Sequence, residues 1–335
     1  MNKVFKNIPG KVFSRILVTG DQGFVGRHAL AGLPGATGLS TLKPALDIRD
    51  KKSLLECLQV FQPDAVLHLA AVSFVPDSFK SPETTFEVNL LGTLRLLEAL
   101  QETGFKGSFV YAGTGDAYGR VQPEDLPIRE DRALKPLNPY AVSKAASEAL
   151  CFQRSQTGLF EITMARPFNH IGAGQSPTFA ISDFARQIAE IAAGERPAVL
   201  NVGNIDATRD FTDVADVVVA YRCMLAHGQN GEIYNICSGV ERSVRTMLLR
   251  LLSLSGVNAE IVVDKARYRP AEQQRVCGSH QKLMDHTGWQ PTIPIDESLL
   301  TLYRYWEARI NESKKNRLDY GNNRTGRGLP GKAAA

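Results

Sequence analysis

Short apolar runs alternate with stretches of helical periodicity through the first half of the chain. The runs predicted to be buried strands lie at residues 14–19, 65–69, 108–111 and 162–165. Helices are expected between them, at residues 24–33, 82–102 and 139–156, and a glycine follows soon after the end of each. Strands that alternate with helices predict an α/β fold: a doubly wound parallel sheet with helices on both faces.

The helix at 82–102 has the clearest periodicity. Ser81, Pro82 and Glu83 form a typical helix start, with a capping hydroxyl, a proline at the first position and an acid after it. Apolar side chains then recur at helical spacing, which is typical of a helix that packs one face on a core. These side chains are Phe86, Leu90, Leu94, Leu97 and Leu100.

The composition of the sequence changes after Pro167. Residues 169–178 are rich in glycine, proline and polar side chains and are expected to form a loop. Further helices are predicted at 179–193, 213–225, 243–255 and 294–308. We expect a first domain at 14–168 with crossings near 206–240, and a smaller α/β domain at 169–205 and 241–308. Flexible basic tails are expected at 1–13 and 311–335, with disorder beyond Ile310.

Composition excludes several classes of protein. The chain has 335 residues, 43% of them hydrophobic, and no apolar run approaches the roughly 18 residues of a membrane span. The basic N-terminus lacks the apolar stretch of a signal peptide. The five cysteines of the chain are widely spaced without a CxxC pair, and its histidines form no HxxxH pair. We therefore expect free thiols in a reducing cytoplasm and no metal site.

The net charge of +4 does not indicate nucleic-acid binding, because the basic residues lie at the ends of the chain. Residues 1–15 hold four Lys or Arg and no acid, and residues 311–335 hold six Lys or Arg and two acids. The body between them is acidic overall. A nucleic-acid surface needs a basic patch on the fold itself, so no nucleic-acid partner is expected.

A glycine-rich segment follows the first predicted strand and opens the first helix. Residues 19–26 read TGDQGFVG, in which the glycines permit a tight turn and a close approach to a pyrophosphate. The helix start adds free N–H groups and a favourable dipole. The GxxGxxG spacing alone is weak, and a plain strand-to-helix turn is the alternative. In this context it predicts a Rossmann-type dinucleotide site, with contacts at Gly20, Gly23, Phe24, Val25, Gly26 and Arg27.

The charge after this motif favours NADP(H), while NAD(H) stays possible. NAD-binding folds usually place an acid roughly 20 residues on, where it binds the ribose 2′-hydroxyl. No Asp or Glu occurs between Arg27 and Leu46, so we expect a 2′-phosphate to meet no repulsion and to find Arg27. Asp47 is the first acid, and it could hold the ribose or lie beside the adenine.

Tyr140 and Lys144 form a YxxxK pair on the helix at 139–156. Residues four apart share a helix face, and a neighbouring ammonium is expected to lower the pKa of the tyrosine. Tyr140 could then exchange protons near neutral pH. The alternative is an amphipathic helix that shows Tyr and Lys by chance. Thr114, in the segment GTGDAYG after the strand at 108–111, could bind a substrate oxygen or could be an ordinary turn residue.

These three motifs, in this order, resemble the extended short-chain dehydrogenase/reductase family over residues 14–308. The resemblance implies catalytic roles for Thr114, Tyr140 and Lys144. It also implies cofactor contacts from the segment after the second strand, from an asparagine in NLLGT, from an adenine-binding pair and from the end of the fourth strand. These are Leu69, Ala70, Ala71, Val72, Asn89, Asp47, Ile48 and Pro167.

Longer strings in the second half resemble the GDP-6-deoxy-D-mannose reductases of that family. They are RPFNHIGAGQ at 166–175, RDFTD at 209–213, YNICSG at 234–239, RPAE at 269–272, GSH at 278–280 and TGW at 287–289. Ala215 departs from the pattern, which has a larger residue there. The resemblance implies hydride transfer from NADPH to C4 of GDP-4-keto-6-deoxy-D-mannose, with GDP-D-rhamnose as product. It also implies that this sugar is used in a bacterial surface polysaccharide.

The substrate adds a pyrophosphate and a guanosine to be bound. Arginine forks match phosphate oxygens, so Arg209, Arg269 and, more weakly, Arg186 are candidates, with surface salt bridges as the alternative. Asn169 could donate to a phosphate and Glu272 could accept from ribose hydroxyls. Candidate contacts to the hexose are Ser73, Thr114, Gly115 and Asp116, although Asp116 could simply anchor its loop.

Three other functions compete with the reductase. A GDP-mannose 4,6-dehydratase needs a carboxylate base near Thr114, where that group resembles Thr-Ser-Glu and this chain has Thr114-Gly115-Asp116. A nucleotide-sugar C4-epimerase would keep its NAD bound. A non-enzymatic NADP(H) sensor would not need both Tyr140 and Lys144. The family often forms homodimers through the helices at 82–102 and 139–156, and a homodimer is expected here.

Overall fold

The structure is a computed structural model that describes residues 10–44, 46–267 and 273–325. It divides into two compact units. Of the described residues, the first unit contains those up to Ile171, those from Ile205 to Val244, and 273–295. The second unit contains Gly172–Asn204, the described residues of 245–268, and those from Asp296 onward.

A six-stranded parallel sheet forms the centre of the first unit. Its order is β2 (Ala36–Gly38), β1 (Ile16–Thr19), β3 (Ala65–His68), β4 (Ser108–Ala112), β5 (Glu161–Pro167) and β9 (Ile233–Ile236). The register places Val18 beside Gly38 and Thr19 beside His68. The order reverses between β1 and β3, which is where doubly wound sheets bind their ligands. This topology confirms the predicted α/β, Rossmann-type fold.

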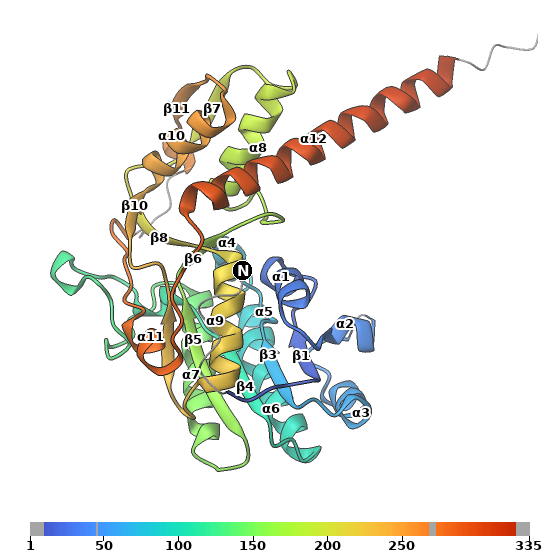
Figure 1. The fold of residues 1–335 in the computed structure, drawn as a ribbon, viewed down its shortest axis with the longest axis vertical. Helices are drawn as coiled ribbons and strands as arrows, with labels where there is room; N and C mark the ends of the chain where they lie inside the picture. Colours follow the sequence, from blue (N-terminus) through green and yellow to red (C-terminus); the bar gives the residue numbers. More distant parts are fainter. Residues whose placement is uncertain (1–9, 45, 268–272, 326–335) are drawn as a thin grey trace, which may run out of the picture. The chain divides into compact units, whose positions relative to one another are not determined.

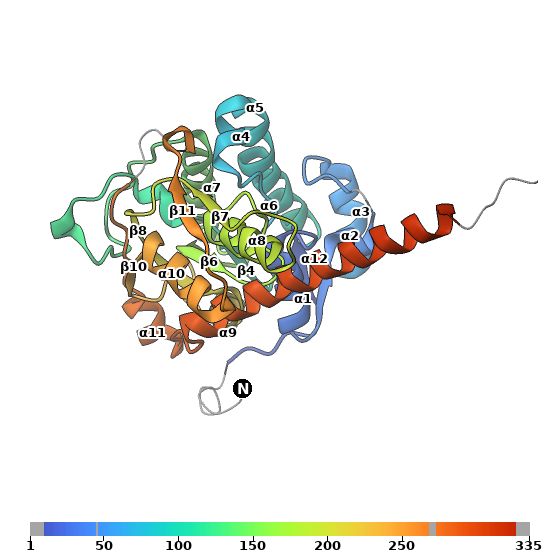
Figure 2. The same cartoon turned by 90° about the horizontal axis from the view of Figure 1, so that it is seen from above.

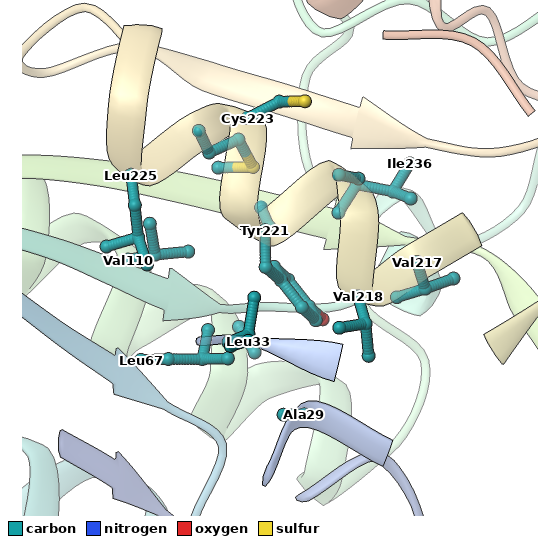
Figure 3. Packing of buried hydrophobic residues seen from close by; sticks show 14 of the residues in the cluster. Ala29, Leu33, Leu67, Val110, Val217, Val218, Tyr221, Cys223, Leu225 and Ile236 are labelled. Atoms are coloured by element: carbon teal, nitrogen blue, oxygen red, sulfur yellow. The ribbon is translucent and has the colours of Figure 1, made fainter. Parts of the chain in front are cut away.

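Alternate residues of these strands face opposite layers of helices, as strand geometry requires. Val18, Leu67 and Val110 pack with α1 (Phe24–Gly32), α9 (Val214–His227) and α11 (Gln281–Thr287). Figure 3 shows Tyr221 and Val218 of α9 directed at Leu33, Leu67 and Ala29. This packing presses α1 against the sheet and so fixes the position of its first turn.

The other face carries α3 (Lys51–Phe61), α6 (Gly92–Glu102) and α7 (Pro139–Ser155), packed on strand residues such as Leu17, Val66 and Phe109. Figure 1 shows α9 in yellow, α6 in cyan and α7 in green around the strands. Helix α4 (Val75–Lys80) lies beside α5 (Pro82–Phe86), as Figure 2 shows. The outcome is a sheet buried on both faces, which parallel sheets require.

The predicted helix at 82–102 contains an irregular turn. It consists of α5, a π-helical turn at Glu87–Leu91 and α6. Leu97 and Leu100 are buried as the periodicity indicates, but Phe86, Leu90 and Leu94 are only partly buried. Thr85, Asn89 and Thr93 are buried instead. The π turn holds one residue more than an α turn, and polar side chains therefore face the sheet.

Smaller elements complete the two units. A three-stranded sheet in the first unit has the order β10 (Glu241–Ser243), β8 (Thr208–Asp213) and β6 (Asn169–Ile171). The second unit contains α8 (Ala180–Ala192), α10 (Val244–Ser255) and α12, with β7 (Val199–Val202) paired in parallel to β11 (Glu260–Val263). The short helix α2 (Leu39–Leu42) follows β2, and 3₁₀ turns lie at Gly115–Tyr118, Pro123–Asp125 and Lys265–Arg267. None of the helices in the described residues is long and apolar enough to span a membrane.

Helix α12 extends further than the sequence pattern predicts. It runs from Ile295 to Thr325, although we expected a helix end at residue 308 and disorder beyond Ile310. Lys314 donates to the backbone oxygen of Ala193 (2.8 Å) and Arg317 pairs with Glu195. These contacts hold the polar extension against the end of α8, and they join residues far apart in sequence.

Candidate active site

The glycine loop between β1 and α1 is shaped for close backbone approach. Gly20 has a φ of +69°, and a Cβ added to it would lie 2.7 Å from the backbone nitrogen of Ala70. A Cβ on Gly26 would lie 2.2 Å from the oxygen of Gly20. Gly23 precedes α1 and caps it without a side-chain hydrogen bond. The first N–H groups of α1 are thus not occupied by a cap, and the loop fits the pyrophosphate of a dinucleotide.

The segment after β3 lies beside this loop and is held by Asn89. The Asn89 side chain accepts from the Val72 nitrogen (2.8 Å) and donates to the Val72 oxygen (3.1 Å). It also donates to the Ser143 hydroxyl (2.9 Å), which donates in turn to the Tyr140 backbone oxygen (2.8 Å). Asn89 therefore connects the segment that we expect to flank the cofactor, Leu69–Val72, to helix α7. The sequence offered Asn89 as a cofactor contact, which stays a prediction.

His68 at the end of β3 lies in a chain of buried hydrogen bonds that sequence reasoning missed. Its Nδ1 is 2.7 Å from the Thr19 hydroxyl and its Nε2 is 2.9 Å from the Thr93 hydroxyl. Thr93 donates its proton to the backbone oxygen of Asn89 (2.5 Å), so it accepts from Nε2–H, and Nδ1 accepts from Thr19. Burial, with Lys144 nearby, lowers the pKa of His68 to about 3. The only sequence signal is one polar residue in an apolar strand.

Replacing His68 by glutamine is expected to flatten the pH dependence of stability on the acid side. The pKa of His68 is lowered from 6.5 to about 3, so between these values the unfolded chain binds a proton that the folded chain does not. Stability therefore falls as the pH drops below 6.5, by about 2 kcal/mol from His68 alone at about pH 5. Urea unfolding of both proteins at neutral pH and at about pH 5 measures this difference. Equal losses in the two proteins would contradict the assignment.

Thr114 and Tyr140 meet at the carboxyl end of β4. Thr114 is 8% exposed, its hydroxyl accepts from the Asp116 nitrogen (3.2 Å), and its side chain lies near enough to Tyr140 to influence the pKa of that hydroxyl. Tyr140 is in the first turn of α7, where the Asn138 side chain caps the helix by accepting from the Ala141 nitrogen (2.7 Å). The helix start and the strand end thus bring together two of the three residues predicted to be catalytic.

Lys144 lies one turn further along α7 and is buried. Its ammonium is 4.4 Å from the centroid of the Tyr111 ring, and its backbone oxygen accepts from the Tyr111 hydroxyl (3.2 Å). Burial lowers the pKa of Lys144 to about 8. The ammonium is still mainly charged at neutral pH, and the tyrosine ring face stabilises it.

The expected lowering of the Tyr140 pKa is wrong for this structure. Burial raises that pKa above its ordinary value, and the Asp116 carboxylate raises it further, while the hydrogen bond with Thr114 lowers it. Asp116 is two residues from Thr114 and exposed, and the YxxxK spacing gives no sign of it. Tyr140 therefore holds its proton at neutral pH, which suits a proton donor rather than a base.

The other predicted cofactor residues come from several elements of the first unit. Phe24 in α1 stacks on the His170 ring, with centroids 5.9 Å apart. Asp47 makes a paired contact with Arg49 (2.7 Å), which lowers its pKa, and Ile48 is buried against Gly92. Val25 is partly buried, Arg27 is exposed on α1, and Pro167 ends β5. Each of these contacts with a cofactor stays a prediction.

The stretch from Arg27 to Leu46 contains no acid, but a carboxylate from outside it lies at the end of β2. The Asp21 side chain, from the glycine loop, is 5% exposed and lies against Gly38, the last residue of β2. Its carboxylate accepts from the Ser40 nitrogen (3.3 Å) and from the Ser40 hydroxyl. A search along the chain from Arg27 to Leu46 passes over Asp21, because the residue precedes that window and reaches it only through the fold.

The predicted substrate residues are spread over both units. In the first unit, Ser73, Asp116 and Asn169 are exposed, and a Cβ on Gly115 would lie 3.2 Å from the Phe168 ring. Arg209 in β8 donates to the backbone oxygens of Thr208 (2.7 Å) and Gln273 (2.9 Å). Their roles toward a substrate stay predictions.

Arg186 is in the second unit, on α8, where both its ion-pair partners belong to the same helix. It pairs with Asp183 (2.6 Å) and Glu190. This arrangement supports the salt-bridge alternative that the sequence left open. Arg269 and Glu272 lie outside the described residues.

A buried ion pair that the sequence did not reveal connects α7 to β5. Arg166 donates to both carboxylate oxygens of Glu148 (2.8 and 2.6 Å), and their side chains are 3% and 6% exposed. Arg166 also donates to the Tyr118 hydroxyl (2.9 Å) and to the backbone oxygen of Glu130 (3.1 Å). Tyr118 donates to Asn235 (2.6 Å). Since Glu148 is one turn after Lys144, this network fixes α7 next to the loop that carries Thr114.

The chain is similar to enzymes that act on GDP-sugars. A family model described as GDP-mannose 4,6 dehydratase matches residues 43–301. The GDP-6-deoxy-D-mannose reductase of Pseudomonas aeruginosa is 47% identical over 301 residues, which cover 89% of this chain and 99% of that protein. The GDP-mannose 4,6-dehydratase of Yersinia enterocolitica is 31% identical over 283 residues, 75% of each chain.

A solved structure matches closely as well. RMD from Pseudomonas aeruginosa complexed with NADPH superposes with a TM-score of 0.84 at 45% identity, and the match covers 88% of this chain and 99% of that one. The match extends over nearly the whole of that protein, so both the sheet and the smaller elements have counterparts in it.

Proposed function

The chain belongs to the GDP-mannose 4,6 dehydratase family of the extended short-chain dehydrogenases/reductases, and we propose that within this family it is a reductase. It transfers a hydride from NADPH to C4 of GDP-4-keto-6-deoxy-D-mannose and forms GDP-D-rhamnose. The relative named as a reductase is much more similar to it than the relative named as a dehydratase. The structural observation that carries the proposal is that Thr114, after the end of β4, lies near Tyr140 in the first turn of α7, with the buried Lys144 one turn further on.

Each residue of the site has its own role in the proposed reduction. NADPH supplies the hydride when it is bound. The glycine loop and the start of α1 hold its pyrophosphate. Tyr140 gives its proton to the C4 oxygen as the carbonyl is reduced, and Thr114 orients that oxygen. Lys144 holds the nicotinamide ribose through its ammonium.

The protonated state of Tyr140 at neutral pH is compatible with the reductive direction. A phenol that keeps its proton at neutral pH can donate it to a developing alkoxide, whereas oxidation of an alcohol begins with a base. The Asp116 carboxylate contributes to this raised pKa, so it tunes the donor besides any contact with the hexose. This role differs from that of the base in a dehydratase.

The dehydratase alternative is less compatible with the space around Thr114. A serine at position 115 would place its Cβ 3.2 Å from the Phe168 ring, so the ring would have to give way. Asp116 is shorter than the glutamate that the dehydratases have there.

We assign cofactor binding to residues 14–168 with crossings near 206–240, and nucleotide-sugar binding to 169–205 and 241–308.

One assay tests the reductase. The protein is mixed with GDP-4-keto-6-deoxy-D-mannose and either NADPH or NADH, and cofactor oxidation is followed. NMR of the product then gives the configuration at C4. Oxidation with GDP-D-rhamnose as product supports the proposal. No oxidation, together with consumption of GDP-mannose, would identify a dehydratase, and a C4-epimeric product would make it a talose-forming reductase.

We further propose a homodimer that pairs the outer faces of α6 and α7. The outward positions of α7 include Val142 and Phe152, which are 38% and 49% exposed, and Leu91 precedes α6 at 38%. Apolar side chains gathered on neighbouring helices are typical of an interface between copies.

All five cysteines are buried free thiols, which fits a cytoplasmic enzyme.

Replacing Phe152 by glutamate is expected to convert the dimer into a monomer. The change places a charge in the apolar face, in place of an aromatic side chain of the kind that contributes most to association. Light scattering after size-exclusion chromatography measures the mass. Val60→Glu, at an 88% exposed position of α3, is the matched control and keeps the dimer. A dimeric Phe152→Glu protein, or a monomeric wild type, would rule the interface out.

A further inference from the structure

A carboxylate occupies the position where dinucleotide-binding folds read the adenosine ribose, although β2 does not supply it. In such folds the acid follows the second strand and accepts from the 2′-hydroxyl. Here β2 ends at Gly38, and a Cβ at that position would lie 2.2 Å from the Oδ2 of Asp21. The space beside the end of β2 is therefore filled by the side chain of a residue in the glycine loop.

The fold delivers Asp21 to this position in two steps. β1 and β2 pair in parallel with Val18 beside Gly38, so both strands end at the same edge. Gly20 then adopts its positive φ of +69° and turns the chain, which leaves Asp21 next to the neighbouring strand. Ser40 holds the carboxylate through its nitrogen (3.3 Å) and its hydroxyl.

The contacts of Asp21 explain its position but do not require its charge. Ser40 lies in the first turn of α2, and Asp21 serves there as a capping acceptor in place of Gly38, which has no side chain. An asparagine oxygen could accept the same hydrogen bonds. A fixed negative charge beside the adenosine ribose has a different effect, because a 2′-phosphate carries roughly −1.5 to −2 charges and is repelled.

The basic groups of this region oppose that repulsion unequally. Lys43 donates to Ser53 (2.9 Å) and pairs with Glu56 (3.0 Å), so its ammonium is already engaged. Arg27 is exposed on α1, one turn into the helix that the loop opens. The balance at the ribose therefore lies mainly between Arg27 and Asp21.

We propose that Asp21 is the residue that sets selectivity between NADP(H) and NAD(H), by weakening the binding of the 2′-phosphate that Arg27 favours. The proposal rests on the dinucleotide site of the proposed function. It does not depend on the sugar substrate or on the chemistry at C4. Asp21 is accordingly a specificity residue and takes no part in proton or hydride transfer.

The test compares affinities for the two oxidised dinucleotides without turnover. Isothermal titration of the full chain with NADP⁺ and with NAD⁺ gives two dissociation constants for each variant. Asp21→Asn keeps the shape and the acceptor oxygen and removes the charge. We expect it to tighten NADP⁺ binding by about tenfold, because repulsion between charges at this range is of that order. NAD⁺ binding is expected to change by less than about threefold.

Ser40→Ala is the matched control. It removes the hydroxyl that holds Asp21 but retains the charge and the backbone donor, so the ratio of the two affinities is expected to stay at the wild-type value. Thermal melts of all three proteins check that folding is unchanged. Equal ratios in wild type and Asp21→Asn, or the same shift in Ser40→Ala, would overturn the selectivity role while leaving the proposed function intact. Failure of both dinucleotides to bind the wild type would overturn both.

Discussion

The Tyr140→Phe protein is expected to reduce the keto sugar about a thousandfold more slowly than the wild type, while it still binds NADPH. The substitution removes a single hydroxyl, which the structure places in contact with Thr114 at the end of β4. This hydroxyl is protonated at neutral pH, as a tyrosine of ordinary pKa would also be, and general acids of this kind contribute about 10²–10⁴ to the rate. The measurements are kcat with saturating NADPH and the dissociation constant of NADPH from its fluorescence.

The binding measurement separates chemistry from structure. If Tyr140 acts as the proton donor, kcat falls and the NADPH dissociation constant stays within about threefold. Tyr305→Phe, which removes a tyrosine hydroxyl in the second unit, is the control and should retain full activity. A Tyr140→Phe protein within about tenfold of the wild-type kcat would remove Tyr140 from the mechanism.

Replacing Arg166 by methionine is expected to destabilise the protein by about 3–5 kcal/mol, the largest effect on stability that we predict. Arg166 and Glu148 are both buried, and Glu148 would be left without its bidentate partner. Tyr118 would lose a donor as well. An unpaired buried carboxylate costs far more than the net stabilisation that the pair provides. Urea unfolding at neutral pH measures the loss.

The double variant Arg166→Met, Glu148→Gln shows whether the orphaned charge causes the loss. It removes both charges, so it is expected to be more stable than Arg166→Met alone. If the single variant loses less than about 1 kcal/mol, or if the double variant loses the sum of two large effects, the ion pair does not carry the stability assigned to it.

The sequence predicts those parts of the molecule in which neighbours along the chain determine the structure. The glycines at 20, 23 and 26 lie in one loop, and Tyr140 and Lys144 in one helix, so spacing alone places them. The parallel sheet follows from the alternation of strands and helices. Thr114 could be placed because it directly follows a strand whose apolar pattern is clear.

What the sequence could not predict depends on contacts between distant segments. Asp21 reaches the end of β2 only because β1 and β2 are adjacent, and Asp116 affects Tyr140 only because a strand end meets a helix start. His68 appears in the sequence as one polar residue in a strand, yet its partners come from β1 and α6. Charges and hydrogen bonds that act through space leave no local pattern to detect.

The π-helical turn at Glu87–Leu91 reverses the usual relation between burial and tolerance of substitution. Thr85, Asn89 and Thr93 are the buried positions around the turn, and the latter two are committed to hydrogen bonds with Val72, Ser143 and His68. Leucine introduced at Asn89 or Thr93 would leave their buried polar partners without hydrogen bonds, whereas a polar residue at the partly exposed Leu90 or Leu94 would leave no buried partner unpaired. In a comparison of natural variants, the buried positions around this turn should therefore conserve polarity, and the partly exposed Leu90 and Leu94 should be the ones that vary.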